Sequence, residues 1–280
     1  MSPRYSWKKW MLLTALIAPV ITAWSSLALA QDADCLRRLA QGKNRFGEPL
    51  PFAALRKMTI AKEKSRSQLS QDRFALLIDY SRNSRDRRAF LIDFAACDVV
   101  AAENVIHGGS IYRPETHWGD PNQDGQLDHC AHVNGSQKYM TRPGAFVTAG
   151  CHQTRLTGWT HLSRNCQGIK LVGMDSYNSD AFEKGIVLHE HVEIPNDATV
   201  KPTGQGCPAF PMGRLKNLLR YGLMEGTILY VHAPQCFKSK ASSIGQTERH
   251  PEKRAIPVGE SLTPVTDEQR FYERRVRAVR

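Results

Sequence analysis

Short apolar runs separated by polar turns occupy the middle of this 280-residue chain. Residues 74–80 and 89–93 are two such runs, and the charged stretch 81–88 between them predicts a β-hairpin. Runs of this length, bounded by turn-forming residues, indicate strands rather than helices. The same pattern predicts further strands at residues 99–107, 145–148, 168–172, 185–189 and 227–231.

Helical patterns flank these strands. Residues 31–72 are polar and compatible with helices, with a break at Pro49-Leu50-Pro51, and form an expected N-terminal helical lead-in. Leucines at helical spacing predict a buried helix over residues 214–223, with Gly226 as its stop. The expected architecture is therefore mainly β with flanking helices, of the α+β class, with a principal domain over residues 73–236.

Residues 237–280 form an expected basic tail that contains several prolines. Thr266 to Gln269 resembles a capping box that opens a terminal helix, whose end carries a cluster of arginines. Two interpretations stay open. The helix lies on an anionic envelope surface, or the tail is a solvated basic segment.

The first thirty residues have the pattern of an export signal. A basic start at Arg4, Lys8 and Lys9 precedes a mostly apolar run, and Ala28-Leu29-Ala30 matches the small-x-small cleavage pattern. We expect cleavage before Gln31, no stable transmembrane segment afterwards, and an exported protein in the periplasm or cell envelope. A retained membrane anchor is the alternative, although the apolar run is short for a bilayer crossing.

The formal charge of the chain is +11, and +8 remains once the three basic residues of the signal are removed. In an exported protein this charge favours an anionic envelope polymer or membrane surface as a partner. The chain carries no nucleic-acid-binding motif, so nucleic acid is not an expected partner. A role of the charge in solubility alone is the alternative interpretation.

The chain contains seven cysteines, all after the signal, where export permits disulfides. One of them must stay unpaired within the chain. Cys207 is the candidate, because it follows a Gly-x-Gly stretch, follows a strand ending in His189, and precedes a helix whose dipole would favour a thiolate. A histidine that accepts the thiol proton makes such a cysteine a nucleophile. A disulfide partner or a buried structural thiol is the alternative, and the sequence does not choose among the pairings of the other cysteines.

Ile186-Val187-Leu188-His189 followed by Gly206-Cys207-Pro208-Ala209 resembles the signature of the YkuD-like L,D-transpeptidase catalytic domain family, in its Gly-Cys-Pro-Ala branch. The likeness spans residues 74–232, and fourteen residues lie between His189 and Gly204, within the range of the family. It also includes the segments Leu76–Ser81, Val105–Gly108, Asn134–Gly144 and Lys170–Met174.

The resemblance implies a murein L,D-transpeptidase whose catalytic domain is a β-sandwich or mixed sheet. Such an enzyme acts on peptidoglycan stem peptides and needs no metal or organic cofactor. His189 would deprotonate Cys207, and the thiolate would attack the carbonyl on the L-centre side of an L,D-peptide bond in a tetrapeptide stem. D-Alanine would leave, and the resulting thioester would pass to an amine. Backbone amides near Gly206 and Cys207 would stabilise the negative charge that develops on the carbonyl oxygen.

The chain departs from the usual Ser/Thr-His-Gly-Cys pattern of the family, because it has Gly204-Gln205-Gly206-Cys207 instead. A polar side chain and a second histidine are missing, so Gly204 and Gln205 become the expected substrate-binding positions. His191 lies on the same strand face as His189 and is a competing base or a further substrate-binding residue. Position in the family motif favours His189 as the base.

Two other functions stay open. A hydrolase on the same scaffold, similar to an L,D-carboxypeptidase or endopeptidase, would pass the acyl group to water. A catalytically inactive envelope-binding module would keep the fold and the basic surface, with Cys207 in a disulfide. Only the second alternative lacks a reactive thiol.

A segment of the central region has the spacing of a calcium loop. Asp120, Asn122, Asp124 and Asp128 match its oxygen-ligand positions. Ala131 stands where the loop needs its bidentate carboxylate, which weakens such a site. A turn built by Asx and glycine residues is therefore the favoured interpretation, and we expect no bound metal.

Overall fold

The computed structural model describes residues 33–108, 125–128, 130, 140–153, 158–196 and 206–237. The expected export signal, the tail from residue 238 onward and three calcium-loop positions, Asp120, Asn122 and Asp124, lie outside the described residues. Within the described ranges, every helix is too short or too polar to span a lipid bilayer.

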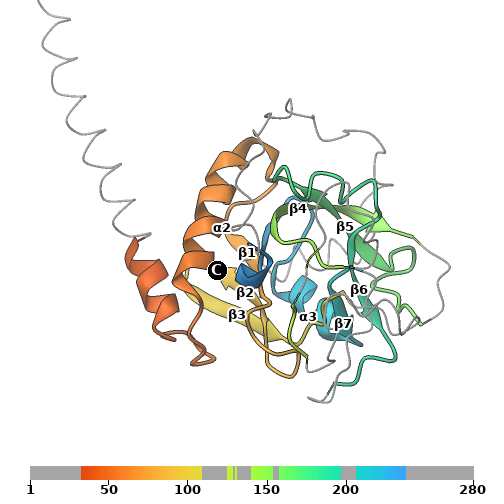
Figure 1. The fold of residues 1–280 in the computed structure, drawn as a ribbon, viewed down its shortest axis with the longest axis horizontal. Helices are drawn as coiled ribbons and strands as arrows, with labels where there is room; N and C mark the ends of the chain where they lie inside the picture. Colours follow the sequence, from red (N-terminus) through yellow and green to blue (C-terminus); the bar gives the residue numbers. More distant parts are fainter. Residues whose placement is uncertain are drawn as a thin grey trace, which may run out of the picture.

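One sheet of eight strands forms the centre of the described structure (Figure 1). In chain order the strands are β1 (Phe74–Asp79), β2 (Ala89–Asp93), β3 (Asp98–Glu103), β4 (Gly144–His152), β5 (Gly168–Gly173), β6 (Val187–His191), β7 (Ala209–Pro211) and β8 (Ile228–His232). Their order across the sheet is β3-β2-β1-β8-β4-β5-β6-β7. The last strand in the sequence therefore lies in the middle and joins the two halves of the sheet.

Most neighbouring strands are antiparallel, and two pairs are parallel. β1 and β2 form the expected hairpin, with Leu76 opposite Leu91. β8 runs parallel to β1, with Leu229 beside Leu76, and β7 runs parallel to β6, with Ala209 beside His189. Parallel neighbours cannot be joined by a tight turn, so these two pairings are long-range contacts that a local pattern does not reveal.

The mainly β architecture with flanking helices is confirmed, and every expected strand has a counterpart in the sheet. The boundaries differ most at three places: β3 ends at Glu103 rather than at His107, β4 continues to His152, and β6 covers Val187–His191 rather than residues 185–189, so His189 does not end its strand. Strand β7 was not expected at all. Its three residues end in Pro211, and so short a run carries no alternation for a sequence pattern to detect.

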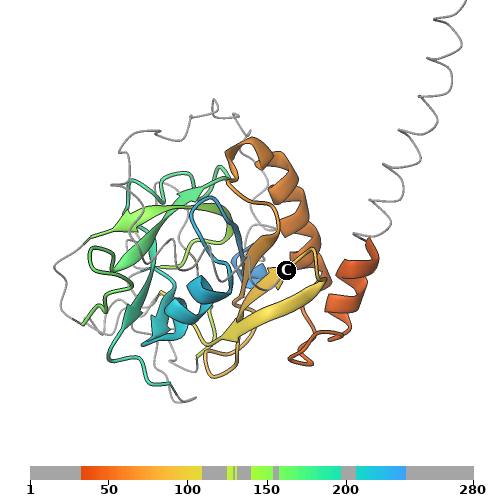
Figure 2. The same ribbon diagram turned by 180° about the vertical axis from the view of Figure 1, so that it is seen from behind.

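Both faces of the sheet are covered. Helix α2 (Phe52–Lys64) and the helical residues 33–40 pack on one face, and helix α3 (Arg214–Tyr221) packs on the other (Figures 1 and 2). Along β1, Leu77 packs in the apolar cluster under α2, and Leu76 packs in the cluster under α3. Because both faces are covered, all six residues of β1 are buried and its sequence is a continuous apolar run.

Helix α3 is two residues shorter than the predicted helix over 214–223, and its stop is Gly222 rather than Gly226. Gly222 has a φ of 126°, a backbone conformation that favours glycine. The ring of Phe74 also fills the space that a side chain there would need, since a Cβ at position 222 would lie 2.6 Å from it. Leu223, just beyond the helix, is still part of the core, as its apolar character indicated.

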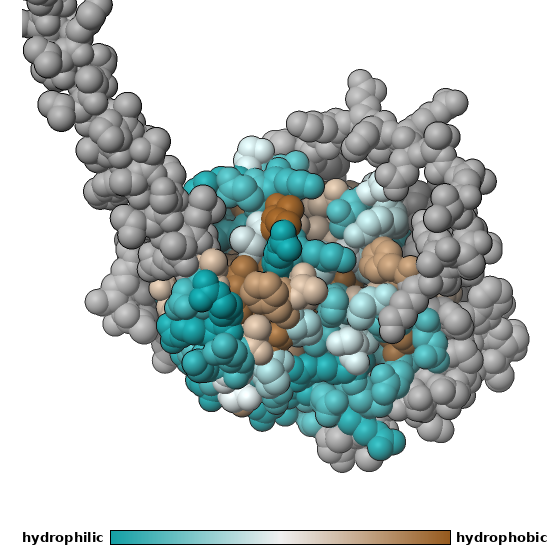
Figure 3. Space-filling view, turned by 60° about the vertical axis from the view of Figure 1, so that its left-hand side comes forward, coloured by the Kyte–Doolittle hydropathy of each residue, from teal (hydrophilic) through white to brown (hydrophobic). Residues whose placement is uncertain are grey.

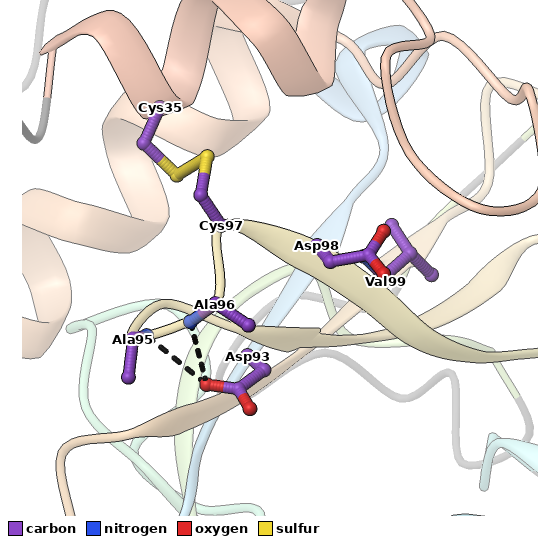
Figure 4. Close-up of a disulfide and its surroundings, with 7 residues drawn as sticks. All are labelled: Cys35, Asp93, Ala95, Ala96, Cys97, Asp98 and Val99. Atoms are coloured by element: carbon purple, nitrogen blue, oxygen red, sulfur yellow. Dashed lines mark hydrogen bonds between the residues drawn. A yellow bond between two sulfur atoms is a disulfide. The ribbon is translucent and has the colours of Figure 1, made fainter.

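Three disulfides connect distant parts of the fold: Cys35–Cys97, Cys130–Cys236 and Cys151–Cys166. The first links the N-terminal helical segment to the turn between β2 and β3 (Figure 4). In this turn the Asp93 carboxylate accepts hydrogen bonds from the backbone N–H groups of Ala95 and Ala96 at 3.0 and 3.2 Å. The turn is therefore ordered at the point where the helical segment is attached to it.

The face of the molecule shown in Figure 3 is mostly hydrophilic over the described residues. Its hydrophobic residues lie in small, separate patches rather than in one wide area. This distribution is typical of a surface that faces water, because every protein surface keeps some apolar groups exposed. The view gives no sign of a broad apolar contact area on this face.

Disulfides that close loops of different length should stabilise the protein to different degrees. Cys35 and Cys97 are 62 residues apart, and Cys151 and Cys166 are 15 apart. Loop-closure entropy predicts that replacing the first pair with alanines lowers the free energy of unfolding by about 4 kcal/mol, and replacing the second pair lowers it by about 3 kcal/mol. Equilibrium denaturant unfolding of the two double variants measures this difference. A larger loss from the shorter loop would contradict the entropic explanation.

Candidate active site around Cys207 and His189

Cys207 is the free cysteine of the chain, because the other six form the three disulfides. All seven cysteines lie among the described residues. The pairing that the sequence left open is thus decided, and the possibility that Cys207 is a disulfide partner within the chain is removed. A single thiol stays available for chemistry.

The parallel pairing of β6 with β7 positions this thiol. His189 lies beside Ala209, so Cys207, two residues before Ala209, lies at the level of Val187 on β6. The backbone N–H of Val187 donates a hydrogen bond to Cys207 Sγ at 3.4 Å, and the thiol donates one to the Gly185 carbonyl oxygen at 3.7 Å. The start of β6 and the residue Gly185 before it therefore hold the sulfur, and the middle of β6 carries the histidine.

Gly206 must be glycine for a structural reason. Its φ is 90°, which a residue with a side chain rarely adopts. In addition, a Cβ at this position would lie 2.8 Å from the carbonyl oxygen of Met140, a backbone atom that cannot move aside easily. The glycine before the cysteine thus lets the chain that carries the thiol pass close to residues 140–142.

Burial keeps the thiol of Cys207 protonated in the resting protein. Cys207 is 7% exposed, and this burial raises the pKa of the thiol to about 11. The Val187 N–H and the charge of Arg142 act in the opposite direction and lower the pKa. They do not offset burial, so ionisation needs help from a neighbouring base.

His189 is held in a defined orientation by an aromatic neighbour and by the backbone. Its ring stacks on Trp159 with the ring centroids 3.7 Å apart and the planes within 1° of parallel. His189 Nδ1 lies 3.4 Å from the Glu190 carbonyl oxygen. A carbonyl only accepts hydrogen bonds, so this contact assigns the proton to Nδ1 and leaves Nε2 with a lone pair that can accept a proton.

Burial also keeps the imidazole neutral. The pKa of His189 falls to about 3, mainly because the ring is removed from water; the Glu190 carbonyl acts to raise it, and the nearby His191 and His152 act to lower it. Between pH values of about 3 and about 11 the resting site therefore contains a neutral imidazole and a neutral thiol. A neutral imidazole is the form that can act as a base.

Sequence reasoning missed Trp159. This residue belongs to the segment of residues 158–160, which is hydrogen-bonded along β6. The backbone N–H of Val192 donates to the Gly158 carbonyl at 2.9 Å, and the Thr160 hydroxyl donates to the Glu190 carboxylate at 2.7 Å. The Cys151–Cys166 disulfide closes the loop that contains this segment. An aromatic residue between two paired cysteines is the signal that the sequence held, but the pairing itself was unknown.

Among the described residues, no hydrogen bond joins Cys207 to His189. His191, the competing base, has its ring centroid 6.5 Å from that of His189. Its Nδ1 accepts a hydrogen bond from the backbone N–H of Glu193 at 3.2 Å, and its Nε2 lies against Gly158. The structure thus places both histidines on one side of β6, as strand alternation predicted. His189 contacts Trp159 and the Glu190 carbonyl, and His191 contacts Gly158 and the backbone of Glu193.

The other predicted site residues have different outcomes. Gly204 and Gln205 lie outside the described residues, and so does most of the calcium-loop segment. Asp128, its last position, is described and exposed. Among the described residues, no group of three or more His, Cys, Asp or Glu side chains is arranged to hold a metal ion.

One part of the sequence argument for a reactive thiol is wrong. Cys207 was expected to precede a helix whose dipole favours the thiolate. Strand β7 instead separates Cys207 from α3, which begins only at Arg214. A helix dipole acts mainly within the first turn, so α3 gives no support to a thiolate at Cys207.

Comparisons with known proteins identify the family of the chain. A family model described as the L,D-transpeptidase catalytic domain matches residues 48–232, about two thirds of the chain, which include all eight strands, His189 and Cys207. The solved structure of the Ldtfm-avibactam carbamoyl enzyme is similar over 58% of this chain and 50% of that one, with 10% sequence identity and a TM-score of 0.33. This chain thus spans about half the length of that protein. No curated protein matches the chain.

The buried neutral state of His189 predicts a pH dependence of stability. In the unfolded chain this histidine takes up a proton below its ordinary pKa of 6.5, but in the folded protein its pKa is about 3. The unfolded state therefore binds more protons between these pH values, and stability falls as the pH drops, by up to about 1.4 kcal/mol per pH unit from this group. Denaturant unfolding should show a weaker pH dependence in His189→Asn than in the wild type.

The matched control for this measurement is His161→Asn, because His161 is exposed. This control should leave the acid dependence of the wild type unchanged. If His189→Asn and the wild type lose stability in parallel between pH 6.5 and 3, the assignment of a buried neutral imidazole is wrong.

Proposed function

The chain belongs to the L,D-transpeptidase catalytic domain family, and on this basis we propose that it transfers acyl groups of peptidoglycan stem peptides through Cys207. The observation that carries the proposal is the free thiol of Cys207, held beside the strand of a buried, neutral His189 while every other cysteine is oxidised. One of seven cysteines stays unpaired in any case, so the place of this thiol beside the strand of a neutral histidine is what favours a nucleophile over an inactive binding module. Cysteine nucleophiles need such a thiol and a base within reach.

The first half-reaction begins with proton transfer from Cys207 to His189 Nε2. The thiolate attacks the carbonyl carbon on the L-centre side of the L,D-peptide bond, and the carbonyl oxygen becomes negatively charged. Backbone N–H groups near Gly206 and Cys207 are the proposed donors to this oxygen. When the tetrahedral intermediate collapses, His189 returns the proton to the leaving nitrogen, D-alanine departs, and a thioester remains on Cys207.

The second half-reaction repeats this sequence with a different nucleophile. His189 removes a proton from the amine of a second stem peptide, the amine attacks the thioester carbonyl, and the new amide bond forms the cross-link. The sulfur of Cys207 leaves and recovers its proton from His189. Water in place of the amine would give hydrolysis, so only the acceptor distinguishes a transpeptidase from a carboxypeptidase in this site.

The resting geometry requires an adjustment when the substrate binds. Cys207 and His189 share no hydrogen bond in the resting state, and catalytic hydrogen bonds often shorten only in the substrate complex. Gly204 and Gln205, just before the nucleophile, are the proposed positions that contact the stem peptide. His191 is the proposed further contact on the same side of β6.

Export to the periplasm or cell envelope is part of the proposal. Three disulfides are consistent with an oxidising compartment, and the first thirty residues carry the pattern of an export signal. The helical lead-in of residues 31–72 would then begin the mature chain, and the basic tail from residue 237 would be available to an anionic envelope surface.

A covalent adduct tests the nucleophile directly. Mixing the mature protein with a tetrapeptide muropeptide should produce a thioester on Cys207 with the mass of the muropeptide less one D-alanine, seen by intact-mass spectrometry. Cys207→Ala should form no adduct and lose at least about a thousandfold in D-alanine release, because the nucleophile is gone. Failure of the wild type to form an adduct or release D-alanine would reject the proposal. The products formed with and without an added amine separate cross-linking from hydrolysis.

Substitution of each histidine identifies the base. His189→Asn should slow adduct formation by about a hundredfold or more, because the group that takes the thiol proton is lost. His191→Asn is the comparison on the same strand and should slow adduct formation less than His189→Asn, because His191 is proposed to contact the substrate and not to take the thiol proton. Rates of adduct formation by mass spectrometry measure both effects, and the reverse order would assign the base to His191.

A further inference from the structure

Arg142 is a buried cation with one hydrogen-bonding group unused. It forms a two-point ion pair with Asp180, with Nε to Oδ1 at 3.0 Å and Nη2 to Oδ2 at 3.2 Å. Its side chain is 3% exposed, and its Nη1 has no hydrogen-bond partner among the described residues. An unused buried donor on a charged group costs stability, and it therefore calls for an explanation.

The other deeply buried arginine shows that this fold can satisfy such a group. Arg88 is fully buried and stacks on the ring of Tyr80. Its Nε donates to the Val105 carbonyl oxygen at 2.6 Å, its Nη1 to the Arg82 carbonyl oxygen at 3.1 Å, and its Nη2 lies 3.0 Å from His107 Nδ1. All three nitrogens of Arg88 are in use, so the unused nitrogen of Arg142 is a particular feature of its location.

The two chain segments that hold Arg142 also form the surroundings of the thiol. On one side, the carbonyl oxygen of Met140, two residues before Arg142, lies directly against Gly206. On the other side, Asp180 lies within the turn of residues 176–185, and the carbonyl oxygen of Gly185 at its end accepts the hydrogen bond of the Cys207 thiol. The guanidinium is thus held between the two segments that contact residues 206 and 207.

The positive charge of Arg142 lowers the pKa of the Cys207 thiol and so favours the thiolate. Burial raises the pKa of Cys207, and Arg142 lowers it. The Val187 N–H is the only hydrogen-bond donor to the sulfur among the described residues. A thiolate formed in this buried site would therefore have one backbone donor and one nearby fixed positive charge.

We propose that Arg142 is a positioning residue that stabilises the thiolate of Cys207, with Nη1–H as the donor reserved for the negatively charged sulfur. The inference rests on the proposed function and extends it. When the S–H bond breaks, its proton goes to His189 Nε2, and the negative charge left on the sulfur is balanced by the guanidinium. Asp180 holds the guanidinium in place by two hydrogen bonds and leaves the third nitrogen for this purpose.

The test follows the ionisation of Cys207 without any peptidoglycan substrate. Because Cys207 is the single thiol, its alkylation by iodoacetamide can be followed by intact-mass spectrometry, and the rate at a given pH is proportional to the thiolate fraction. Arg142→Gln should raise the pKa of the thiol and slow alkylation about tenfold at mildly alkaline pH. Arg142→Lys keeps the charge and should recover part of the rate.

Two further variants separate an electrostatic effect from a structural one. Arg73→Gln removes an arginine that pairs with the buried Asp93 elsewhere on the sheet, and it should leave the alkylation rate unchanged. Asp180→Asn keeps an oxygen that can accept a hydrogen bond from Arg142 but removes the negative charge that offsets the guanidinium, so it should speed alkylation. If the role of Arg142 is purely structural, Arg142→Gln and Asp180→Asn should either both slow alkylation or both leave its rate unchanged.

The outcomes are distinct. Alkylation of folded Arg142→Gln at the wild-type rate over the whole pH range would overturn the inference. If Arg142→Gln does not fold, Asp180→Asn decides the question, and a rate equal to or below that of the wild type overturns it. A wild-type protein that forms no thioester with muropeptide, together with the predicted alkylation changes, would reject the proposed function and leave the role of Arg142 standing.

Discussion

The parallel pairing of β6 with β7 is the constraint on which the candidate site depends. It sets His189 beside Ala209, and this register puts the cysteine two residues earlier at the level of Val187. A change of register by one residue would turn the side chains of β7 to the opposite face and remove the thiol from its place. Gly206 makes this approach possible, because the Met140 carbonyl lies where a side chain would be.

Burial of His189 and Cys207, where β6 pairs with β7, has opposite effects on the two groups. It keeps the imidazole of His189 neutral and ready to accept a proton, with Trp159 stacked on one side of the ring and the Glu190 carbonyl on Nδ1. It also disfavours the thiolate that the proposed mechanism requires. A low-dielectric site strengthens the interaction of such a thiolate with any fixed charge, and this is the physical basis of the role proposed for the buried cation of Arg142.

Most of the fold could be predicted from the sequence, because its strands are short apolar runs between polar turns. The β1–β2 hairpin and the strand carrying His189 agree with that pattern. The place of β8 in the middle of the sheet, parallel to β1, could not be predicted, since its partner lies about 150 residues earlier in the chain. The end of α3 at Gly222 also depends on a distant contact, the ring of Phe74, and local propensity placed the stop four residues too late.

For the candidate site, the sequence by itself determined the candidate residue types and their order: an unpaired cysteine after glycine, and a histidine on a strand eighteen positions before it. These are local features of composition and pattern, and a family signature could therefore be recognised in them. Only the tertiary structure decided which cysteines pair, which residues bury the thiol, and that Trp159 and Arg142 lie at the site. The physical reason is that burial, stacking and charge depend on distances between segments far apart in the chain, and sequence spacing carries no measure of those distances.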